Sequence, residues 1–491
     1  MAETHQPAAG FLGKFTVLRD AAPELWITLV MKLLNFAAYA VTNFTLKLWL
    51  SREFGYSDQQ AIGIVLAWSL TMTVVTLLVG ALTDAIGLRR AFYLGVWVCL
   101  VARAVMVFAT VPWFALAFGL FPLAIGEALG TPVLVAAVRK YSTTRQRSIS
   151  FSASYLMMNV GSFAALRLFD WVRQGLGERG HLALPWLDSS LSTYRTLFLV
   201  SLGIQLLMLP IVWFMRPGVE VTDDGVKFIP PPPKIAGANL LVSFGRTIRD
   251  SAKETARLFG ELFKQAGFYR LLVFLMLIAF LKLIFMQMYY VFPEFGIRVL
   301  GEGAPVGRLW GINSLLVIIL LPFIGALTQR FPAYGMVTLG GIISAASVFI
   351  MALPTAWFQP LADGPFGQWI GHHYLGLTGA VHPYYVMITL YVIVLSFGEA
   401  FYSPRVYEYA SAIAPKGQEA SYGALSYVPF LLAKLLIGTF SGALLATYCP
   451  AVGERHSETM WLFVALTATV APVGLIALRS LIRVPEAGRE K

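Results

Sequence analysis

Ionisable side chains inside long apolar stretches are the first feature of this sequence that could do chemistry. Lys32, Glu127, Lys282 and Glu399 each interrupt such a stretch. A charge placed in hydrocarbon costs about 2.5–3.5 kcal/mol even on the lenient insertion scale, so it needs a partner or a purpose. A carboxylate there can bind and release a proton, and an ammonium group can hold an anion. These residue types therefore indicate that the chain binds a charged ligand and exchanges protons.

Three of these groups, Glu127, Lys282 and Glu399, have an ionisable neighbour that could neutralise them. Arg103 lies at a depth similar to that of Glu127 in the preceding stretch, and we expect the two to form a structural ion pair. Glu399 is predicted to bind substrate and to carry a proton. The alternative is a permanent pair with Lys282 or Lys434 that only fixes helix packing. Both lysines lie near the middle of their stretches, where they could attract a carboxylate.

Uncharged polar residues in the same stretches add hydrogen-bonding groups. Such side chains often only bond neighbouring helices in membranes. We select four of them as residues that line a binding cavity, namely Tyr39, Tyr155, Asn159 and Asn313.

Two further pairs are spaced three residues apart, a distance that brings side chains together on a helix. Arg167 and Asp170 are predicted to form a local ion pair. Arg405 and Glu408 lie near the end of another stretch and are predicted to form a gate or a local pair.

The elements that must position these residues are membrane-spanning helices. Of the 491 residues, 57% are hydrophobic and 13% are charged, whereas a soluble domain carries about 25% charged residues. The apolar stretches reach the roughly 20 residues that a helix needs to cross a bilayer. They lack the period of two that marks membrane strands. Twelve spans are predicted, at 25–50, 60–83, 91–111, 113–138, 149–173, 195–215, 268–297, 306–329, 333–353, 384–410, 421–447 and 458–480.

Charge in the connecting loops predicts the orientation of the chain. Lys and Arg gather on one side, and the 354–383 loop on the opposite side has neither. Cytoplasmic loops carry this excess, so both termini are expected in the cytoplasm, and the net charge of +11 requires no nucleic-acid partner. The long basic connection 217–267 holds a proline run and an amphipathic pattern over 246–264. It is predicted to be a linker with a surface helix that joins two six-helix bundles, 1–216 and 268–491.

The loop after the second span carries a known signature. The pattern G-x-x-x-D-x-x-G-x-R-R is made by Gly80, Asp84, Gly87, Arg89 and Arg90. It resembles the loop signature of the major facilitator superfamily, with Ala85 where a basic residue is usual. Asp84 could accept hydrogen bonds from a helix N-terminus or from an arginine on the same face. We therefore expect Asp84, Arg89 and Arg90 to take part in gating.

Two segments resemble the proton-dependent oligopeptide transporter family. The family's motif F-S-x-x-Y-x-x-x-N-x-G-S is matched by residues 151–162, which include Tyr155 and Asn159. Its order G-E-x-x-x-S-P is matched by residues 398–404. The resemblance implies a major facilitator fold whose first, fourth, seventh and tenth spans line a central cavity. It also places Glu399 where an acid contacts the amino group of the substrate.

The sequence departs from that family at its coupling residues. The family carries E-x-x-E-R-F in the first span, where residues Met31 to Phe36 here lack both acids and the arginine. Thr131 stands before Pro132 where a lysine is usual, and Met286 stands where a glutamate is frequent. Peptide specificity and the usual coupling route therefore do not follow from the resemblance.

These features predict a secondary active transporter that works by alternating access in the plasma membrane, which is the inner membrane of a Gram-negative cell. The first hypothesis is proton-coupled uptake of a small polar or peptide-like solute, with Glu399, Glu127 and Lys32 as coupling residues. Proton-antiport export of amphipathic compounds and a non-transporting receptor or scaffold are the alternatives. No Walker loop or metal-ligand spacing occurs. We expect a monomer without enzymatic activity, cofactor or metal.

Overall fold

The computed structural model describes residues 16–484 except 186–188, 224, 329–330, 414–427 and most of 229–262. At some further helical positions, such as Asp84 and Glu408, only the backbone is described.

Six long helices form the first bundle. Two of them begin at polar capping residues: Ser57 and Thr143 each form a capping box with the residue three positions later. Gly87, with φ of 83°, makes the tight junction between two of the helices. The helices are α2 (Pro23–Phe54), α3 (Asp58–Ile86), α4 (Leu88–Phe108), α6 (Phe121–Lys140), α7 (Thr144–Leu176) and α8 (Thr193–Phe214), preceded by η1 (Thr16–Leu18), with α5 (Pro112–Phe114) and η2 (Ala115–Leu120) extending α6.

The second bundle contains six further spans, one of which is broken. The predicted seventh span, 268–297, is two helices that meet at Val291, because Pro293 has no backbone N–H with which to continue the first helix. The helices are α10 (Ala266–Tyr290), α11 (Phe292–Leu300), α12 (Val306–Leu327), α13 (Ala333–Phe349), α16 (Pro383–Ile413), α18 (Val428–Tyr448) and α19 (Ser457–Ala477). Short elements complete it: η3 (Ile350–Ala352), η4 (Thr355–Phe358), α14 (Gln359–Asp363), α15 (Pro365–Trp369), η5 (Ile370–Leu375) and α20 (Arg479–Ile482).

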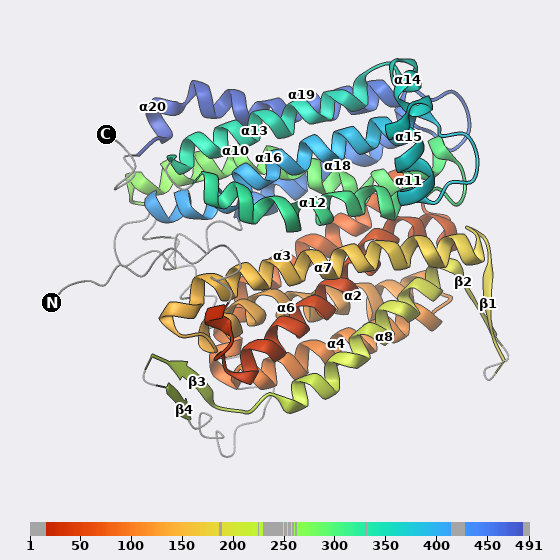
Figure 1. Ribbon diagram of the computed structural model, residues 1–491. Coiled ribbons are helices and arrows are strands. Elements are labelled where there is room, and N and C mark those ends of the chain that lie inside the picture. Colours follow the sequence, from red (N-terminus) through yellow and green to blue (C-terminus); the bar gives the residue numbers. More distant parts are fainter. Residues whose placement is uncertain are drawn as a thin grey trace.

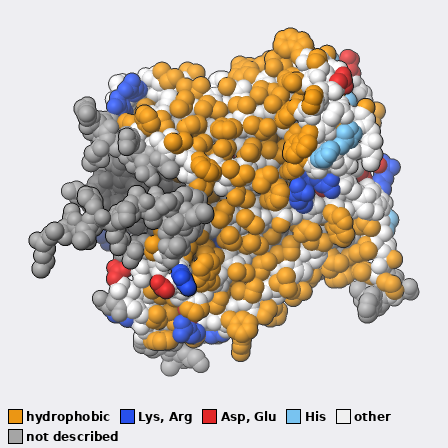
Figure 2. Space-filling model, in the orientation of Figure 1, with side chains coloured by type: hydrophobic (Ala, Val, Ile, Leu, Met, Phe, Trp, Pro, Cys, Tyr) orange, Lys and Arg blue, Asp and Glu red, His pale blue; other side chains and the backbone are white. Residues whose placement is uncertain are grey.

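The predicted fold class is confirmed. Eleven helices of the described chain are long and apolar enough to span a membrane, and the apolar part of α18, Ala433–Tyr448, supplies a shorter twelfth. The first six spans lie together below the last six in Figure 1, and η1 and α20 lie at the same end of the molecule. Hydrophobic side chains cover the wall seen in Figure 2, while charged side chains gather toward the two ends. The chain is therefore an integral membrane protein.

Two short hairpins were not predicted from the sequence. One pairs β1 (His181–Leu184) with β2 (Ser189–Ser192), and the other pairs β3 (Val219–Thr222) with β4 (Gly225–Phe228). The second hairpin occupies the start of the 217–267 connection. The surface helix predicted over 246–264 lies largely outside the described residues, so the boundaries 1–216, 217–267 and 268–491 stay predictions.

Candidate functional site

Glu399 lies in α16 at the junction of the two bundles. Its Oε2 accepts a hydrogen bond from Nδ2 of Asn313 on α12 at 2.9 Å, and Asn313 also donates to Oγ of Ser396 at 3.1 Å. Tyr155 of α7, in the first bundle, lies within hydrogen-bonding reach of the same carboxylate. Only 8% of Glu399 is exposed. The carboxylate is thus held among helices of both bundles.

The glycine before Glu399 explains how deeply the carboxylate is set. A Cβ at Gly398 would lie 2.2 Å from Oγ of Ser344 and 2.9 Å from the carbonyl oxygen of Gly340, both on α13. Glycine at this position therefore lets α16 and α13 approach closely. Because successive helical residues are about 100° apart, the next side chain, Glu399, turns away from α13 and toward α12.

Lys282 on α10 lies beside this carboxylate. Its ammonium is stacked over the rings of Phe285 at 5.4 Å and Tyr402 at 5.2 Å. It is close enough to Glu399 to interact with it electrostatically. Aromatic faces stabilise a cation in a desolvated place, so the two rings and the neighbouring acid favour the charged form of Lys282.

Lys434 on α18 crosses from the second bundle to the first. Its Nζ donates to the carbonyl oxygen of Ser69 at 3.1 Å and to Oγ1 of Thr73 at 2.7 Å, both on α3. Thr73 gives its own hydroxyl hydrogen to the same carbonyl, at 2.9 Å. The lysine is 8% exposed. Among the described residues its hydrogen-bond partners are neutral oxygens.

Tyr39 lies on the face of α2 that turns toward the second bundle. Its ring stacks on Trp68 at 6.3 Å, and its hydroxyl accepts a hydrogen bond from Nδ2 of Asn43 at 3.2 Å. It also lies within electrostatic range of Tyr289 and Tyr290 on α10. Tyr39 therefore lies with Tyr155, Asn313, Lys282, Lys434 and Glu399 in the region where the bundles face one another.

Glu127 is held inside the first bundle by Arg103, as the sequence predicted. The guanidinium donates to the Glu127 carboxylate, to Oγ of Ser201 at 2.6 Å and to Oε1 of Gln205 at 3.3 Å. Arg103 is fully buried. The network joins α4, α6 and α8, so it stabilises the packing of the first bundle.

The remaining predicted residues, the ligand Asn159 and the coupling residue Lys32, have local contacts. Nδ2 of Asn159 donates to the carbonyl oxygen of Tyr155 at 3.0 Å, within α7. The ammonium of Lys32 lies 4.4 Å from the centre of the Phe36 ring, within α2, and the residue is 5% exposed. These contacts do not connect either residue to Glu399.

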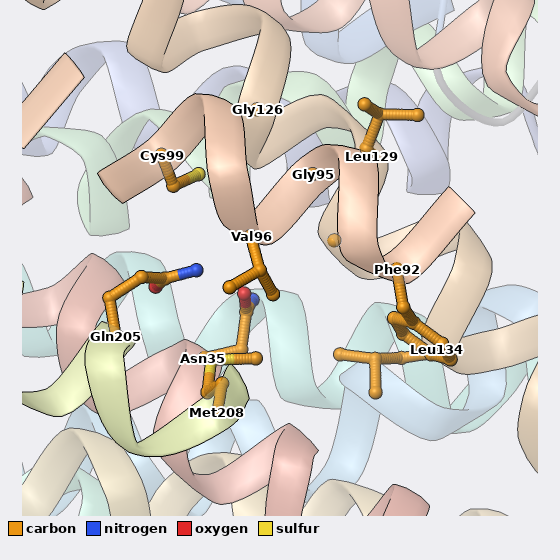
Figure 3. Close-up of a pocket in the computed structure, with 11 residues that line it drawn as sticks. Asn35, Phe92, Gly95, Val96, Cys99, Gly126, Leu129, Leu134, Gln205 and Met208 are labelled. Carbon is orange, nitrogen blue, oxygen red and sulfur yellow. The ribbon is translucent and has the colours of Figure 1, made fainter. Parts of the chain in front are cut away.

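A cavity of about 10 Å³ lies inside the first bundle, between α2, α4, α6 and α8 (Figure 3). Its polar lining comes from Asn35, Cys99 and Gln205, and its other walls are mainly apolar. This volume is enough for about one water molecule. A solute of several heavy atoms would not fit there.

The predicted gating residues are described in part. The side chains of Asp84 and Glu408 lie outside the described residues. Arg89 donates to the carbonyl oxygen of Trp213 at the end of α8, at 3.0 Å, and Arg90 is exposed. Arg405 is buried and donates to Oγ1 of Thr328 at 3.1 Å.

A charged network that the sequence analysis missed joins the bundles at the end away from η1 and α20, which we call the distal end. Lys47 of α2 pairs with Asp58 at 2.7 Å and with Glu294 of α11 at 2.9 Å. Arg298 of α11 pairs with Asp58 at 2.8 Å and with Glu294 at 2.9 Å. Burial alone would raise the pKa of Glu294, but Lys47, Arg298 and Arg52 together hold this pKa below its ordinary value. The sequence contained a sign of this network, because Lys47 and Glu294 are charged residues inside predicted spans.

The pairing predicted for Arg167 and Asp170 is wrong. Arg167 stacks on the rings of Phe163 at 4.9 Å and Tyr374 at 5.2 Å. Asp170 instead pairs with Arg173 at 3.5 Å and accepts hydrogen bonds from the start of α12. Asp170 therefore stabilises the contact between the two bundles, and this contact is favoured over a local ion pair with Arg167.

Comparison with known proteins agrees with this architecture. The family model of the major facilitator superfamily matches residues 28–367. The chain belongs to this superfamily. It is therefore a membrane transporter of small solutes, and carriers of this superfamily are not enzymes. No curated protein matches the sequence.

Solved structures with a similar fold include transporters of the proton-dependent oligopeptide transporter (POT) family. One, from work on substrate recognition in that family, has a TM-score of 0.66 at 17% identity and covers 94% of this chain and 98% of its own. An auto-inhibited POT family peptide transporter has a TM-score of 0.64 at 16% identity and covers 94% and 99%. A POT family transporter in complex with 5-aminolevulinic acid has a TM-score of 0.66 at 13% identity and covers 94% and 96%. At these identities the likeness describes the fold.

Proposed function

We propose that this transporter takes up a small polar organic solute together with protons, and that Glu399 carries the coupling. The supporting observation is that its carboxylate is bound by Asn313 of the second bundle and is within reach of Tyr155 of the first. When the bundles move apart at this level, the carboxylate changes its partners. Protonation and conformation then depend on one another, because a proton shifts the equilibrium by its differential affinity for the two states.

The orientation follows from the distribution of charge. The proximal end, where η1 and α20 lie, also holds the junctions of α3 with α4 and of α6 with α7. Arg89, Arg90, Arg139 and Lys140 lie in or beside these short junctions. Cytoplasmic loops have this excess of basic residues, so both termini face the cytoplasm and the distal end faces outward. The conformation described is then closed toward the outside by the network of Lys47, Asp58, Glu294 and Arg298.

Solute binding is assigned to the side chains between the bundles. Glu399, Lys282 and Lys434 provide charge, and Tyr39, Tyr155 and Asn313 provide hydrogen bonds, with Asn159 supporting Tyr155 from one turn away. Glu127 and Lys32 are further proton-coupling candidates on α6 and α2. Uptake requires the distal end to open, admit the solute and close again, which is alternating access.

Uptake into proteoliposomes under an imposed pH gradient tests this proposal. The labelled solute is chosen by a thermal-shift screen of dipeptides, amino acids and organic acids at two pH values, because a ligand stabilises the folded protein in proportion to its excess over Kd. We expect Glu399→Gln to lose at least nine-tenths of gradient-driven accumulation while retaining solute counterflow. The control is Glu454→Gln, at an exposed position.

The outcomes separate the hypotheses. Unchanged gradient-driven accumulation in Glu399→Gln would remove this residue from the coupling mechanism. Accumulation in inside-out vesicles, instead of right-side-out vesicles, would replace uptake by export. Counterflow in the purified protein excludes a receptor without transport.

A further inference from the structure

We propose that the solute is an organic anion with more carboxylate than amino groups, and that Lys434 holds one of its carboxylates. This inference rests on the proposed transport function and specifies its substrate class. It depends on the balance of buried charge between the bundles and on the partners of two lysines.

The predicted binding and coupling residues, with Arg103, carry more positive than negative charge. Arg103 and Glu127 neutralise one another. The remaining groups are three ammonium groups, on Lys32, Lys282 and Lys434, and one carboxylate, on Glu399. Subtracting one negative from three positive charges leaves an excess of two. Because an uncompensated charge is costly at membrane depth, such a region favours a ligand that brings negative charge.

Lys434 has a hydrogen-bond donor that such a ligand could use. An ammonium group has three N–H donors, and two of those of Lys434 are directed at Ser69 and Thr73. A carbonyl and a hydroxyl oxygen satisfy hydrogen bonds without cancelling the charge. Among the described residues no carboxylate pairs with Lys434, so a carboxylate of the solute would both accept the third N–H and neutralise the lysine.

Lys434 and Lys282 lie at nearly the same depth. Nε2 of Gln287 on α10 donates to Oγ of Ser441 on α18 at 2.7 Å. The two helices run in the same direction, since Arg298, after α10, donates to the carbonyl oxygen of Cys449, just after α18. Lys282 precedes Gln287 by five residues and Lys434 precedes Ser441 by seven. At about 1.5 Å per residue the two ammonium groups differ in height by less than one turn.

Lys32 adds a positive charge closer to the proximal end. It lies four residues before Phe36 and seven before Tyr39, so the three share one face of α2, on which Tyr39 comes within electrostatic range of Tyr289 and Tyr290 of the second bundle. Its contact among the described residues is with the Phe36 ring. An elongated anion lying between Lys434 and Lys32 would therefore meet positive charge at both levels.

A zwitterion fits this balance less well than an anion. A dipeptide with free ends brings one positive and one negative charge, so the excess of two would remain. Blocking its amino group removes the positive charge and leaves the carboxylate. A second carboxylate would offset the excess completely.

Binding of matched compounds to the purified full chain tests the inference at constant ionic strength. The probes are alanyl-alanine as the zwitterion, N-acetyl-alanyl-alanine as the monoanion, its C-terminal amide as the neutral compound, and N-succinyl-alanine as the dianion. We expect the two anions to bind at least tenfold more tightly than the neutral compound and the zwitterion. The inference would be overturned if the zwitterion or the neutral amide bound as tightly as the anions or more tightly. It would also be overturned if the anions did not bind, or if chloride stabilised the protein as much as the anions do.

Variants locate the carboxylate. Lys434→Gln keeps hydrogen-bonding groups but not the charge, and should weaken anion binding at least tenfold. Lys434→Arg should restore most of it, and Lys264→Gln, at an exposed position, should leave it unchanged. If Lys434→Gln does not fold, equal anion affinity of Lys434→Arg at low and high salt would count against the assignment, because a charge-based contact weakens with ionic strength.

The inference and the transport function fail separately. If the anions bind but show no counterflow in proteoliposomes, transport is rejected and the substrate class of the site stands. If the zwitterion is transported with no preference for the anions, transport stands and the inference is rejected.

Discussion

Asp170 of α7 caps helix α12 of the opposite bundle by accepting the backbone N–H of Gly307 at 2.9 Å. Its second oxygen accepts the N–H of Arg308 at 2.5 Å. A carboxylate at a helix N-terminus is favoured by the helix dipole. Arg173 pairs with Asp170 and donates to the carbonyl oxygen of Ala304 at 3.2 Å. This capping contact closes one side of the distal end, while the Lys47 and Glu294 network closes the other.

Gly307→Ala should open the distal end. A Cβ there would lie 2.3 Å from the carbonyl oxygen of Leu166, so α7 and α12 must separate. We expect the rate at which a membrane-impermeant maleimide labels the buried Cys449 to rise several-fold. Gly203→Ala, where a Cβ would meet nothing within 4 Å, is the control. A labelling rate equal to that of the unaltered protein would show that this contact does not set the closed state.

Arg298→Met should weaken the same closed state by a different route. The change removes one of the two cations that Asp58 and Glu294 share, leaving Lys47 as the other, and it removes the hydrogen bond to the carbonyl oxygen of Cys449. Truncating one partner of a buried network is costly because the remaining charges lose compensation. Labelling of Cys449 should rise, and outward-facing solute access should increase. The exposed Arg179, changed to Met, provides the control; equal labelling in the two variants would contradict the prediction.

The closed state should be lost at acidic pH through Glu294. Its pKa lies below its ordinary value, because Lys47, Arg298 and Arg52 outweigh the effect of burial. A lowered pKa means that closure gains stability above the ordinary glutamate value of about 4.3. This gain is lost as the pH falls through the lower pKa of the closed state. Labelling of Cys449, with a reagent that reacts at low pH, should therefore rise below about pH 4. Glu294→Gln should remove this part of the pH dependence, and an unchanged profile would exclude Glu294 as its source.

Glu127→Gln should destabilise the first bundle. It leaves the guanidinium of Arg103, which is fully buried, without its carboxylate. Breaking a buried pair from one side costs about 3–5 kcal/mol. The thermal unfolding midpoint of the purified protein should fall by several degrees, and less in the double variant with Arg103→Met. Arg90→Met, at an exposed position, should have little effect. A double variant less stable than Glu127→Gln would argue against the pair as the cause.

The helices were predictable because hydrophobicity acts locally. The fifth predicted span, 149–173, lies within α7, and α7 extends beyond it at both ends because its first and last turns are polar. The break in the predicted seventh span could not be predicted in the same way, because Pro293 alone does not reveal that a new helix starts beside it. The pair Arg103 and Glu127 could also be predicted, because the two residues lie at matching depth on neighbouring helices.

The contacts between the bundles were not predictable from spacing. Arg167 and Arg173 both lie three residues from Asp170, and helical geometry cannot choose between them. The choice depends on Tyr374 and on the start of α12, which lie far along the chain. The pair Lys47 and Glu294 likewise joins distant segments. Only the three-dimensional arrangement of the bundles brings such residues together.

The contacts between the bundles at the distal end lie far from the level of Tyr39, so a small tilt of one bundle displaces them strongly. Lys47 lies eight residues beyond Tyr39, which is about 12 Å along α2. A tilt of roughly 5° about the level of Tyr39 therefore moves the distal ends by about 1 Å. That is enough to carry the 2.8 Å contact of Arg298 with Asp58 past the limit of a hydrogen bond. A small tilt of one bundle against the other is therefore enough to break the distal contacts. Contacts at the same distance from the level of Tyr39 are stretched equally and should break together.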